Sequence, residues 1–281
     1  MKIALCLFGV VGGHKGKAHS GSSLDVLSKG FECYEKNILS KYDVDVFIHS
    51  WTTEMKSEIL EKYEPKNYKF ENQKIFKIPS YVKGTKGTSR KEKKKRKQNH
   101  YSRWFSTFES VNLKHQYEKE NIIKYDFVLT SRFDVAWQTP IHFEKLDSKL
   151  FYASHWPRWF DENGKKVHDK DWFGLLEKNG NKLKNQYTKK LVGYPYNNEG
   201  LLDLWFLSGS ELMDEFSKLY FNLDEYNKPK NCPRDEYGSI SNHRLSLYHL
   251  EALGLKNNIK LIFDLHDDCP LVRRKYYLTN S

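Results

Sequence analysis

The stretch that decides the fold is YDFVLTSRFDVAW, residues 125–137. Its residues 127–129 (FVL) form a continuous apolar run, as in parallel strands that are buried on both faces of a sheet. Arg132 and Asp134 follow, and a second apolar group, residues 135–137, comes directly after them. An unpaired charge is costly in a protein interior. The pattern therefore predicts a buried strand whose charged end is paired, either within the protein or with a ligand.

Similar strand-like runs alternate with helical patterns along the rest of the chain. The expected strands are residues 3–10, 44–50, 125–130, 204–207 and 260–263. The expected helices, which repeat apolar residues at helical spacing, are residues 23–40, 101–122, 212–221 and 240–253. Ser208 and Glu211 fit a capping box before the third helix, and Gly254 fits a C-cap after the fourth. This alternation predicts an α/β fold, with a mostly parallel, Rossmann-like central sheet flanked by helices, in a single domain over residues 1–281.

Composition excludes several classes of protein. Apolar residues make up 38% of the chain and aromatic residues 15%, which is enough for a substantial core. No apolar run approaches the roughly 18–20 residues that a membrane span requires, and the N-terminal apolar run lacks a convincing signal-peptide cleavage site. The four cysteines lie far apart with no CxxC spacing. These features disfavour a disulfide framework or a zinc site and predict a reducing, cytoplasmic location.

The net charge of +11 is concentrated in one segment. Residues 83–97 (KGTKGTSRKEKKKRK) hold nine Lys or Arg residues and one Glu, a net +8. The surrounding residues 79–100 have almost nothing to bury and are expected to form a mobile basic loop. Three roles are open for it: a solvated loop without function, a lid that attracts an anionic donor or acceptor, or a contact for nucleic acid or an acidic membrane surface. It also fits a nuclear localisation signal.

In a parallel α/β sheet, ligands bind beyond the C-terminal ends of the strands. The first expected strand runs into a loop that contains Gly9, Gly12 and Gly13. Such glycines let backbone amides approach an anionic group, and an ordinary flexible turn explains them equally well. The second expected strand ends in FIHSW, where the pattern favours a hydrogen-bonded, buried His49 and a structural Trp51.

The third strand end is the charged tip of residues 125–137. Asp134 offers hard oxygen ligands for Mg²⁺ or Mn²⁺, which bridges the phosphates of the donor in many nucleotide-sugar enzymes. Arg132 offers two-point hydrogen bonding to a phosphate. An Arg132–Asp134 pair that only closes the strand end is the alternative, and the local residues leave both open.

Six segments together carry a resemblance to a known family. They are KIALCLFGVVGG (2–13), DVDVFIHSW (43–51), YSRWFSTFESVNLKHQYE (101–118), YDFVLTSRFDV (125–135), LLDLWFLSGSELMDEF (201–216) and NHRLSLYHLEALGL (242–255). In order and pattern, they resemble a loosely defined group of viral and bacterial glycosyltransferase-like proteins with the GT-A fold. The resemblance implies a donor-nucleotide half over residues 1–135 and an acceptor half over residues 136–281.

The resemblance also implies site residues. The nucleotide-sugar donor would contact the loop after Gly9 and the SRFDV tip, with Asp134 at the last acidic position of the family's DxD motif. Arg132 occupies the first acidic position, and this departure allows the arginine to replace one cationic function of a divalent cation (Mn²⁺ or Mg²⁺). A late histidine completes the metal site in some members of the family, which points to His266; a turn before Pro270 is the alternative.

Asp203 is the expected catalytic base on the acceptor side. An inverting transferase needs a carboxylate that takes the proton from the attacking hydroxyl. Asp203 comes just before the expected strand at residues 204–207, with Glu199 and Asp235 as further candidates and surface solvation as the alternative for all three. The aromatic residues expected either to stack on acceptor sugars or to pin a loop to the core are Trp156, Trp159 and Trp172.

The leading hypothesis is a cytoplasmic glycosyltransferase, in the host cytoplasm if the protein is viral. It would move a sugar from a nucleotide-sugar donor to a hydroxyl of a glycan or glycoconjugate. The alternative is a nucleic-acid-associated protein, either a DNA-modifying transferase or a noncatalytic binder, that uses residues 83–97. A GT-A fold without activity is a third hypothesis, because the acidic motif is incomplete.

Overall fold

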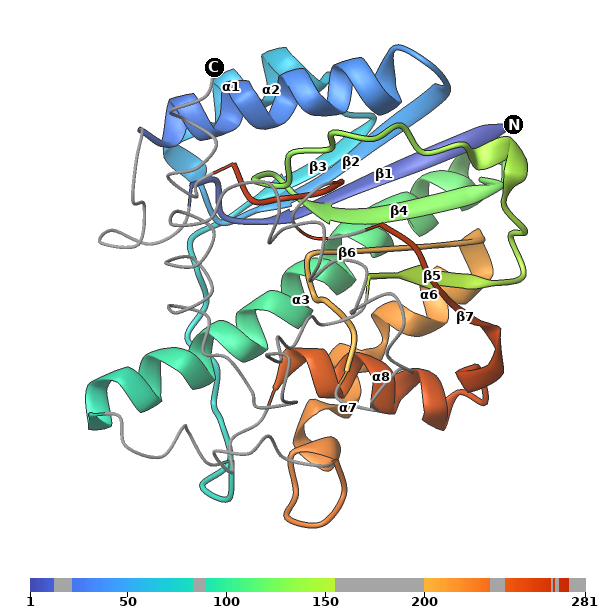
Figure 1. The fold of residues 1–281 in the computed structure, drawn as a ribbon. Coiled ribbons are helices and arrows are strands. Elements are labelled where there is room, and N and C mark those ends of the chain that lie inside the picture. The colour runs from blue at the N-terminus through green and yellow to red at the C-terminus, as the bar shows by residue number, and fades with distance from the viewer. Residues whose placement is uncertain are drawn as a thin grey trace, which may run out of the picture.

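The chain folds into one α/β domain around a seven-stranded sheet (Figure 1). The computed structural model describes residues 1–12, 22–82, 89–154, 200–232, 241–263, 265 and 268–272. Within these ranges the strands are ordered β3-β2-β1-β4-β6-β5-β7, and helices cover both faces of the sheet. The predicted fold class is therefore confirmed: a single domain with a mostly parallel central sheet flanked by helices.

Most neighbouring strands run parallel. The strands are β1 (Lys2–Gly9), β2 (Asp43–Ser50), β3 (Asn67–Phe70), β4 (Phe127–Arg132), β5 (Phe151–Ala153), β6 (Trp205–Ser208) and β7 (Ile259–Leu261). β1 pairs in parallel with β2 and β4, β2 with β3, and β5 with β7, whereas β6 is antiparallel to both β4 and β5. All five predicted strands are present, and β3 and β5 were not predicted.

Two groups of helices sandwich the sheet (Figure 1). One face carries α1 (Ser23–Tyr34) and α2 (Lys56–Tyr63), and α2 was not predicted. The other face carries α3 (Arg90–Asn121), α6 (Ser210–Ser217), α7 (Leu219–Tyr226) and α8 (Asn242–Ala252). The short turns are η1 (Glu35–Leu39, a π-helix), η2 (Thr53–Met55), η3 (Phe143–Lys145) and η4 (Lys256–Asn258).

β1 shows how the two faces share one strand. Leu5 and Leu7 belong to the core that contains the α1 residue Leu27, whereas Cys6 belongs to the core that contains the α3 residue Trp104. Successive side chains of a strand point to opposite faces, so an unbroken apolar run is what a strand covered on both sides requires. β1 is accordingly paired on both edges and buried on both faces.

The prediction of a mobile basic loop over residues 79–100 is wrong from residue 90 onward. Arg90 begins α3, a helix of 32 residues whose N-cap, Ser89, accepts a hydrogen bond from the backbone N–H of Glu92 at 3.2 Å. Lysine, arginine and glutamate are strong helix formers, and Glu92 pairs with Arg96 one turn later at 2.9 Å. The basic composition therefore marks an exposed helix here rather than a loop.

The two predicted helix caps have different outcomes. The capping box before α6 is wrong, because the N-cap is Gly209 and Ser208 ends β6, where its hydroxyl donates to the carbonyl of Leu150 at 2.9 Å. The C-cap after α8 is confirmed. Gly254 has a φ of +74°, and the next amide, that of Leu255, donates to the Leu250 carbonyl at 2.8 Å.

No disulfide joins Cys6, Cys33, Cys232 or Cys269. Among the helices that the structure describes, none combines the length and the apolar character needed to cross a bilayer.

Candidate functional site

The candidate site lies at the edge of the sheet where β1, β2 and β4 end. Because β6 is antiparallel to β4, its first residues reach the same edge. α3 crosses this edge: the hydroxyl of Ser106 accepts a hydrogen bond from the amide of Gly9, the last residue of β1, at 2.8 Å. Strand ends, helix α3 and the residues before β6 therefore meet where α/β proteins bind ligands.

The turn after β1 is held by backbone contacts. Gly9 and Gly12 adopt φ angles of +98° and +77°, which residues with a side chain rarely adopt. The amide of Val11 donates to Thr52 Oγ1 at 3.0 Å, and the amide of Trp51 donates to the Gly9 carbonyl at 3.0 Å. The first turn of the predicted glycine loop is therefore tied to the turn after β2, while Gly13 lies outside the described residues.

A buried network of hydrogen bonds lies next to this turn. His49 is fully buried, with Nδ1 2.7 Å from Ser106 Oγ and Nε2 3.1 Å from Glu71. Burial lowers the pKa of His49, and the nearby Glu71 carboxylate opposes that shift only in part. Trp51 is buried and stacks on Phe105 with ring centroids 5.6 Å apart. The predicted structural roles of His49 and Trp51 are both confirmed.

Arg132 and Asp134 form an internal ion pair at the tip of β4. Nε and Nη2 of the guanidinium donate to the two carboxylate oxygens at 2.8 and 2.7 Å. Asp134 is fully buried, whereas 22% of the Arg132 side chain is exposed. Burial alone would lower the pKa of Arg132, but the Asp134 carboxylate outweighs it and raises that pKa.

This geometry does not fit a divalent cation at Asp134. Mg²⁺ and Mn²⁺ need carboxylate oxygens as ligands, and here both oxygens accept guanidinium hydrogen bonds in a fully buried position. The other predicted metal ligand, His266, lies outside the described residues. Of the two sequence-based interpretations of the tip, the structure shows the Arg132–Asp134 pair.

A second arginine, which the sequence analysis missed, lies at the same edge. Arg103 of α3 pairs with Asp203, its Nε 3.2 Å from the carboxylate, and its Nη2 donates to the Asp203 carbonyl. Its guanidinium also lies over the rings of Phe8 and Trp104, with 4.6 and 4.3 Å to the centroids. Burial, opposed by Asp203 and reinforced by the positive charge of Arg132, lowers the pKa of Arg103 to about 10.

Asp203 is held firmly as an anion. Its carboxylate lies 3.5 Å from His243 Nδ1 as well as 3.2 Å from Arg103. Burial would raise the pKa of Asp203, but the charges of His243, Arg103 and Arg132 together hold it far below its usual range. A carboxylate with so low a pKa is a weak proton acceptor. The contacts of Asp203 thus favour a role in positioning Arg103 over the predicted role of base.

Several predicted site residues fall outside the residues that the structure describes. They are Gly13, Glu199, Asp235, His266 and the three tryptophans Trp156, Trp159 and Trp172.

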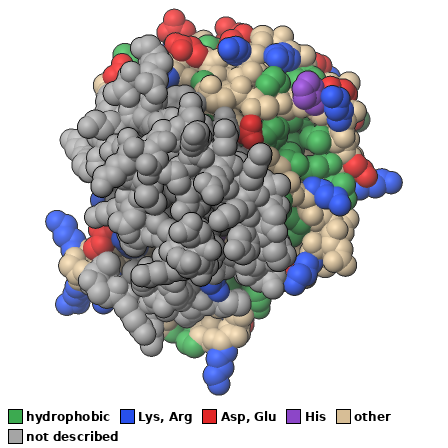
Figure 2. All heavy atoms as spheres, viewed as in Figure 1, with side chains coloured by type: hydrophobic (Ala, Val, Ile, Leu, Met, Phe, Trp, Pro, Cys, Tyr) green, Lys and Arg blue, Asp and Glu red, His purple; other side chains and the backbone are tan. Residues whose placement is uncertain are grey.

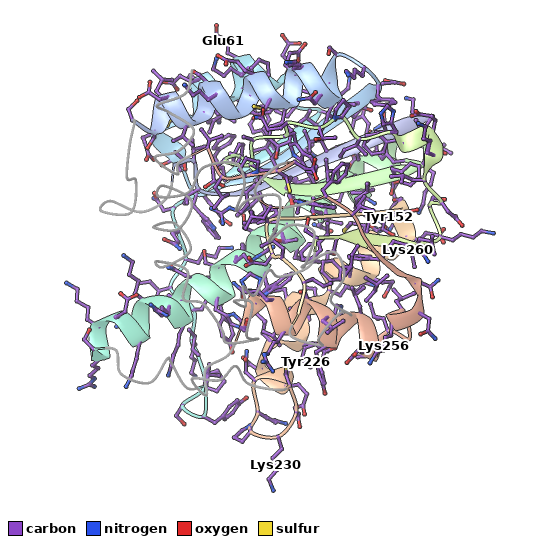
Figure 3. The ribbon with its side chains drawn as sticks, in the orientation of Figure 1. Glu61, Tyr152, Tyr226, Lys230, Lys256 and Lys260 are labelled. Carbon is purple, nitrogen blue, oxygen red and sulfur yellow. The ribbon has the colours of Figure 1, made fainter. Side chains whose placement is uncertain are left out.

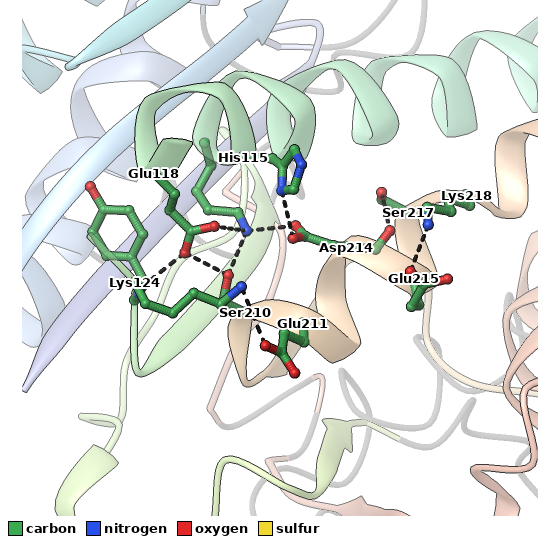
Figure 4. A network of polar contacts seen from close by, with 11 residues as sticks. His115, Glu118, Lys124, Ser210, Glu211, Asp214, Glu215, Ser217 and Lys218 are labelled. Carbon is green, nitrogen blue, oxygen red and sulfur yellow. Dashed lines mark hydrogen bonds and ion pairs between the residues drawn. The ribbon is translucent and has the colours of Figure 1, made fainter. Parts of the chain in front are cut away.

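A group of potential metal ligands, His115, Glu118 and Asp214, lies elsewhere, between α3 and α6 (Figure 4). The ammonium of Lys114 already occupies the place of a cation: it donates to Asp214 at 2.5 Å, to Ser210 at 2.6 Å and to Glu118 at 3.0 Å. Lys114 is fully buried and its three hydrogen bonds are all made. This group does not fit a metal ion, and it joins the two helices.

Glu118 completes this network. Burial alone would raise the pKa of Glu118, but hydrogen bonds from Ser210 and from the Tyr125 amide, together with Lys114, lower it. A surface pocket of about 420 Å³ opens beside the network, with Phe108 and His115 in its wall. Lys114 and Glu118 lie roughly 16–22 Å along the axis of α3 from Arg103, toward the C-terminal end of the helix.

Comparison with known proteins gives a weak structural likeness, for which one solved structure is an example. No protein-family model matches the chain, and no curated protein is similar to it in sequence. A similar solved structure is 4-diphosphocytidyl-2C-methyl-D-erythritol synthase from Anaerococcus prevotii, with 12% identity and a TM-score of 0.44 over 99% of this chain and 94% of that one. So distant a likeness supports no functional inference, and the fold assignment rests on the sheet order above.

Proposed function

We propose that the protein is a nucleotide-sugar-dependent glycosyltransferase that moves a sugar to a hydroxyl of a glycan or glycoconjugate. The observation that carries the proposal is the pair of arginines, Arg103 and Arg132, at the C-terminal edge of the parallel strands, where the charge of Arg132 is close enough to lower the pKa of Arg103. Two guanidinium groups beside a glycine turn suit a diphosphate, which accepts hydrogen bonds from both.

The Nη1 nitrogen of Arg132 is available to bind the nucleotide-sugar donor. Its Nε and Nη2 are engaged by Asp134. Among the described residues, none accepts a hydrogen bond from Nη1. Because the carboxylate is buried and the guanidinium is partly exposed, a ligand that approaches the tip of β4 meets a positive charge. A phosphate oxygen is the natural acceptor for this group.

In the proposed reaction, the bond between the anomeric carbon and the donor diphosphate breaks, and its electron pair stays on the diphosphate oxygen. The acceptor hydroxyl forms the new bond to the anomeric carbon, and its proton passes to the oxygen of the leaving diphosphate, which departs as the free nucleotide. Arg132 and Arg103 would stabilise the negative charge that develops on the leaving diphosphate. Asp203 acts on Arg103, whose side chain it fixes at two points.

Metal-independent donor binding is part of the proposal. A divalent cation usually neutralises the diphosphate in the resembling family, but the carboxylate of Asp134 is not open to such an ion. The two arginines carry the positive charge that the donor requires, so the proposed chemistry needs no step through a metal.

Donor binding can be tested by thermal shift with UDP-, GDP-, CMP- and dTDP-sugars. We expect one nucleotide class to raise the melting temperature of the wild type, and Arg103→Met and Arg132→Met to abolish that shift. Arg96→Met is the matched control, because it removes a guanidinium from an exposed turn of α3. If no donor shifts the wild type, or if the control loses the shift as well, the proposal fails.

Transfer is then measured as release of the free nucleotide from the donor that binds. The proposal requires slow donor hydrolysis without an acceptor and faster release with a suitable glycan. A protein that binds the nucleotide without any release over hours would be an inactive member of the fold.

A further inference from the structure

The first two turns of α3 form a dense array of positive charge. We define residues Arg90–Lys97 (RKEKKKRK) as the basic arm. Seven of its eight residues are Lys or Arg and one is Glu, which gives a net charge of +6. The arm is helical, and five of its basic residues are exposed: Arg90, Lys91, Lys94, Lys95 and Arg96.

Most of this charge is not neutralised within the protein. Glu92 pairs with Arg96. Arg90, Lys91 and the other exposed lysines of the arm form no ion pair with any described residue. Figure 2 shows Lys and Arg side chains that project at the lower left, where α3 begins, and in Figure 3 nitrogen-tipped side chains radiate from the same end of the helix. The arm therefore presents its charge to solvent.

The arm lies on the same side of the molecule as the candidate site. α3 runs unbroken from Arg90 to Arg103, and at 1.5 Å per residue the arm lies roughly 9–20 Å along the helix axis from Arg103. Figure 1 shows this end of α3 extending beyond the sheet, whereas Glu61, labelled in Figure 3, lies on α2 at the opposite side. A polyanion held by the arm would thus lie next to the site.

The charge spacing of the arm matches that of a nucleic-acid duplex. Eight helical residues span about 12 Å, so a net charge of +6 corresponds to about one charge per 2 Å. Duplex DNA carries one negative charge per about 1.7 Å of its axis. The major groove also admits an α-helix between two rows of phosphates, and the basic residues of the arm lie on every side of its helix.

An acidic membrane surface fits the arm less well. A helix that binds in the plane of a membrane presents an apolar face to the lipid. Residues 90–97 contain no apolar side chain, and their charges are not confined to one side of the helix. We therefore propose that the basic arm binds duplex nucleic acid through phosphate contacts, without sequence preference. This proposal does not depend on the proposed transferase activity.

The test is a fluorescence anisotropy titration of the full chain with a short labelled DNA duplex over a range of salt concentrations. The arm variant is Arg90→Gln, Lys91→Gln, Lys94→Gln and Lys95→Gln together. Glutamine is a good helix former, and the side chains are exposed. Far-UV circular dichroism and the melting temperature establish that the variant keeps the fold.

The control removes the same charge from elsewhere. Lys36, Lys41, Lys145 and Lys149 are exposed. Lys41 lies two residues before β2, and Lys145 and Lys149 lie in the chain that leads into β5, so they lie at the opposite edge of the sheet from the arm. Replacing these four lysines by glutamine lowers the net charge by the same four units.

We expect the arm variant to bind the duplex at least about tenfold more weakly at low salt, with a slope of log K against log salt that is shallower by about 3–4. The control should stay within about twofold of the wild type. Three results would overturn the proposal: equal loss in both variants, no duplex binding by the wild type at low salt, or tighter binding to phosphatidylserine vesicles than to the duplex.

Discussion

Arg132 and Asp134, two residues apart at the tip of β4, are joined by two parallel hydrogen bonds of 2.8 and 2.7 Å. The pair is asymmetric, because the carboxylate is fully buried and the guanidinium is partly exposed. A charged strand tip is thus compatible with the surrounding core: the negative charge is compensated inside the protein, and the positive charge is the one that is partly exposed.

Asp134→Asn should destabilise the fold. Removing one member of a buried ion pair costs about 3–5 kcal/mol, and we expect about 3 kcal/mol here, because Arg132 keeps some contact with water. Urea unfolding measures the change. Glu144→Gln serves as the control, since Glu144 is exposed and should change the free energy of unfolding by less than about 0.5 kcal/mol. A loss as small as the control's would mean that the pair contributes little.

Binding of the nucleotide-sugar donor should not depend on a divalent metal ion. Because Asp134 is engaged by Arg132, the shift in melting temperature that a nucleotide-sugar produces should be the same in EDTA and in Mn²⁺ or Mg²⁺. The control is Asp134→Asn, which should not create metal dependence. A donor-induced shift that disappears in EDTA would show that a metal ion takes part in binding. It would contradict the proposal that Arg103 and Arg132 supply the positive charge for the donor diphosphate.

Lys114→Met should be among the most destabilising single substitutions. It leaves the carboxylates of Glu118 and Asp214 without their buried cation, which costs about 3–5 kcal/mol. Lys124→Met is the matched control, because Lys124 is half exposed and 3.7 Å from Glu211, and a surface pair of this kind contributes about 0–1 kcal/mol. Chemical denaturation of both variants decides whether the network between α3 and α6 is structural.

The stability of the protein should fall between pH 6.5 and pH 5. Burial lowers the pKa of His100 and of His249 to about 4, from an ordinary value of about 6.5. In this window the unfolded chain binds protons that the folded chain does not, so stability is lost as the pH falls. Each histidine should contribute about 2 kcal/mol by pH 5.

His249→Gln isolates one of these contributions. His249 lies 2.8 Å from the Tyr226 hydroxyl through Nδ1 and 3.3 Å from the Glu215 carbonyl through Nε2, as a neutral imidazole requires. The variant should lose about 1.5 kcal/mol less than the wild type from pH 6.5 to pH 5. His142→Gln, at an exposed position, should leave the slope unchanged. Parallel slopes for His249→Gln and the wild type would contradict the prediction.

The long apolar strands are the part of the fold that the sequence predicts well. β1, β2 and β4 are buried on both faces, so their apolar runs are unbroken and their positions follow directly. β3 and β5 were missed for physical reasons. β3 is a half-exposed edge strand of four residues, and β5 has three residues, too few for any periodicity.

The start of α3 was predicted to be a loop because its residues have few apolar side chains to bury. Residues 90–97 bury almost nothing, which is typical of a loop, but they extend a helix that Trp104 anchors in the core. Helix formation there depends on propensity, on the Ser89 cap and on the turns that follow. These features indicate a helix less strongly than apolar periodicity does, and the high net charge of the segment favoured the loop prediction.

The candidate site was predicted only in part. Arg132 and Asp134 are two residues apart, so their pairing was a visible alternative in the sequence. Arg103 and Asp203 are a hundred residues apart, and their contact depends on β6 returning antiparallel to β4. The available signal was the position of Arg103 itself, a charged residue among aromatic ones on the face of α3 that packs on the sheet.

The antiparallel direction of β6 brings the two ends of a long connection together. β5 ends and β6 begins at the same edge of the sheet, where the amide of Leu202 donates to the carbonyl of Ser154 at 2.8 Å. A short hairpin is enough to join two such strands, so the sheet itself does not set the length of the connection between them. Pairing of β5 with β6 should therefore tolerate changes in the length and the residues of that connection.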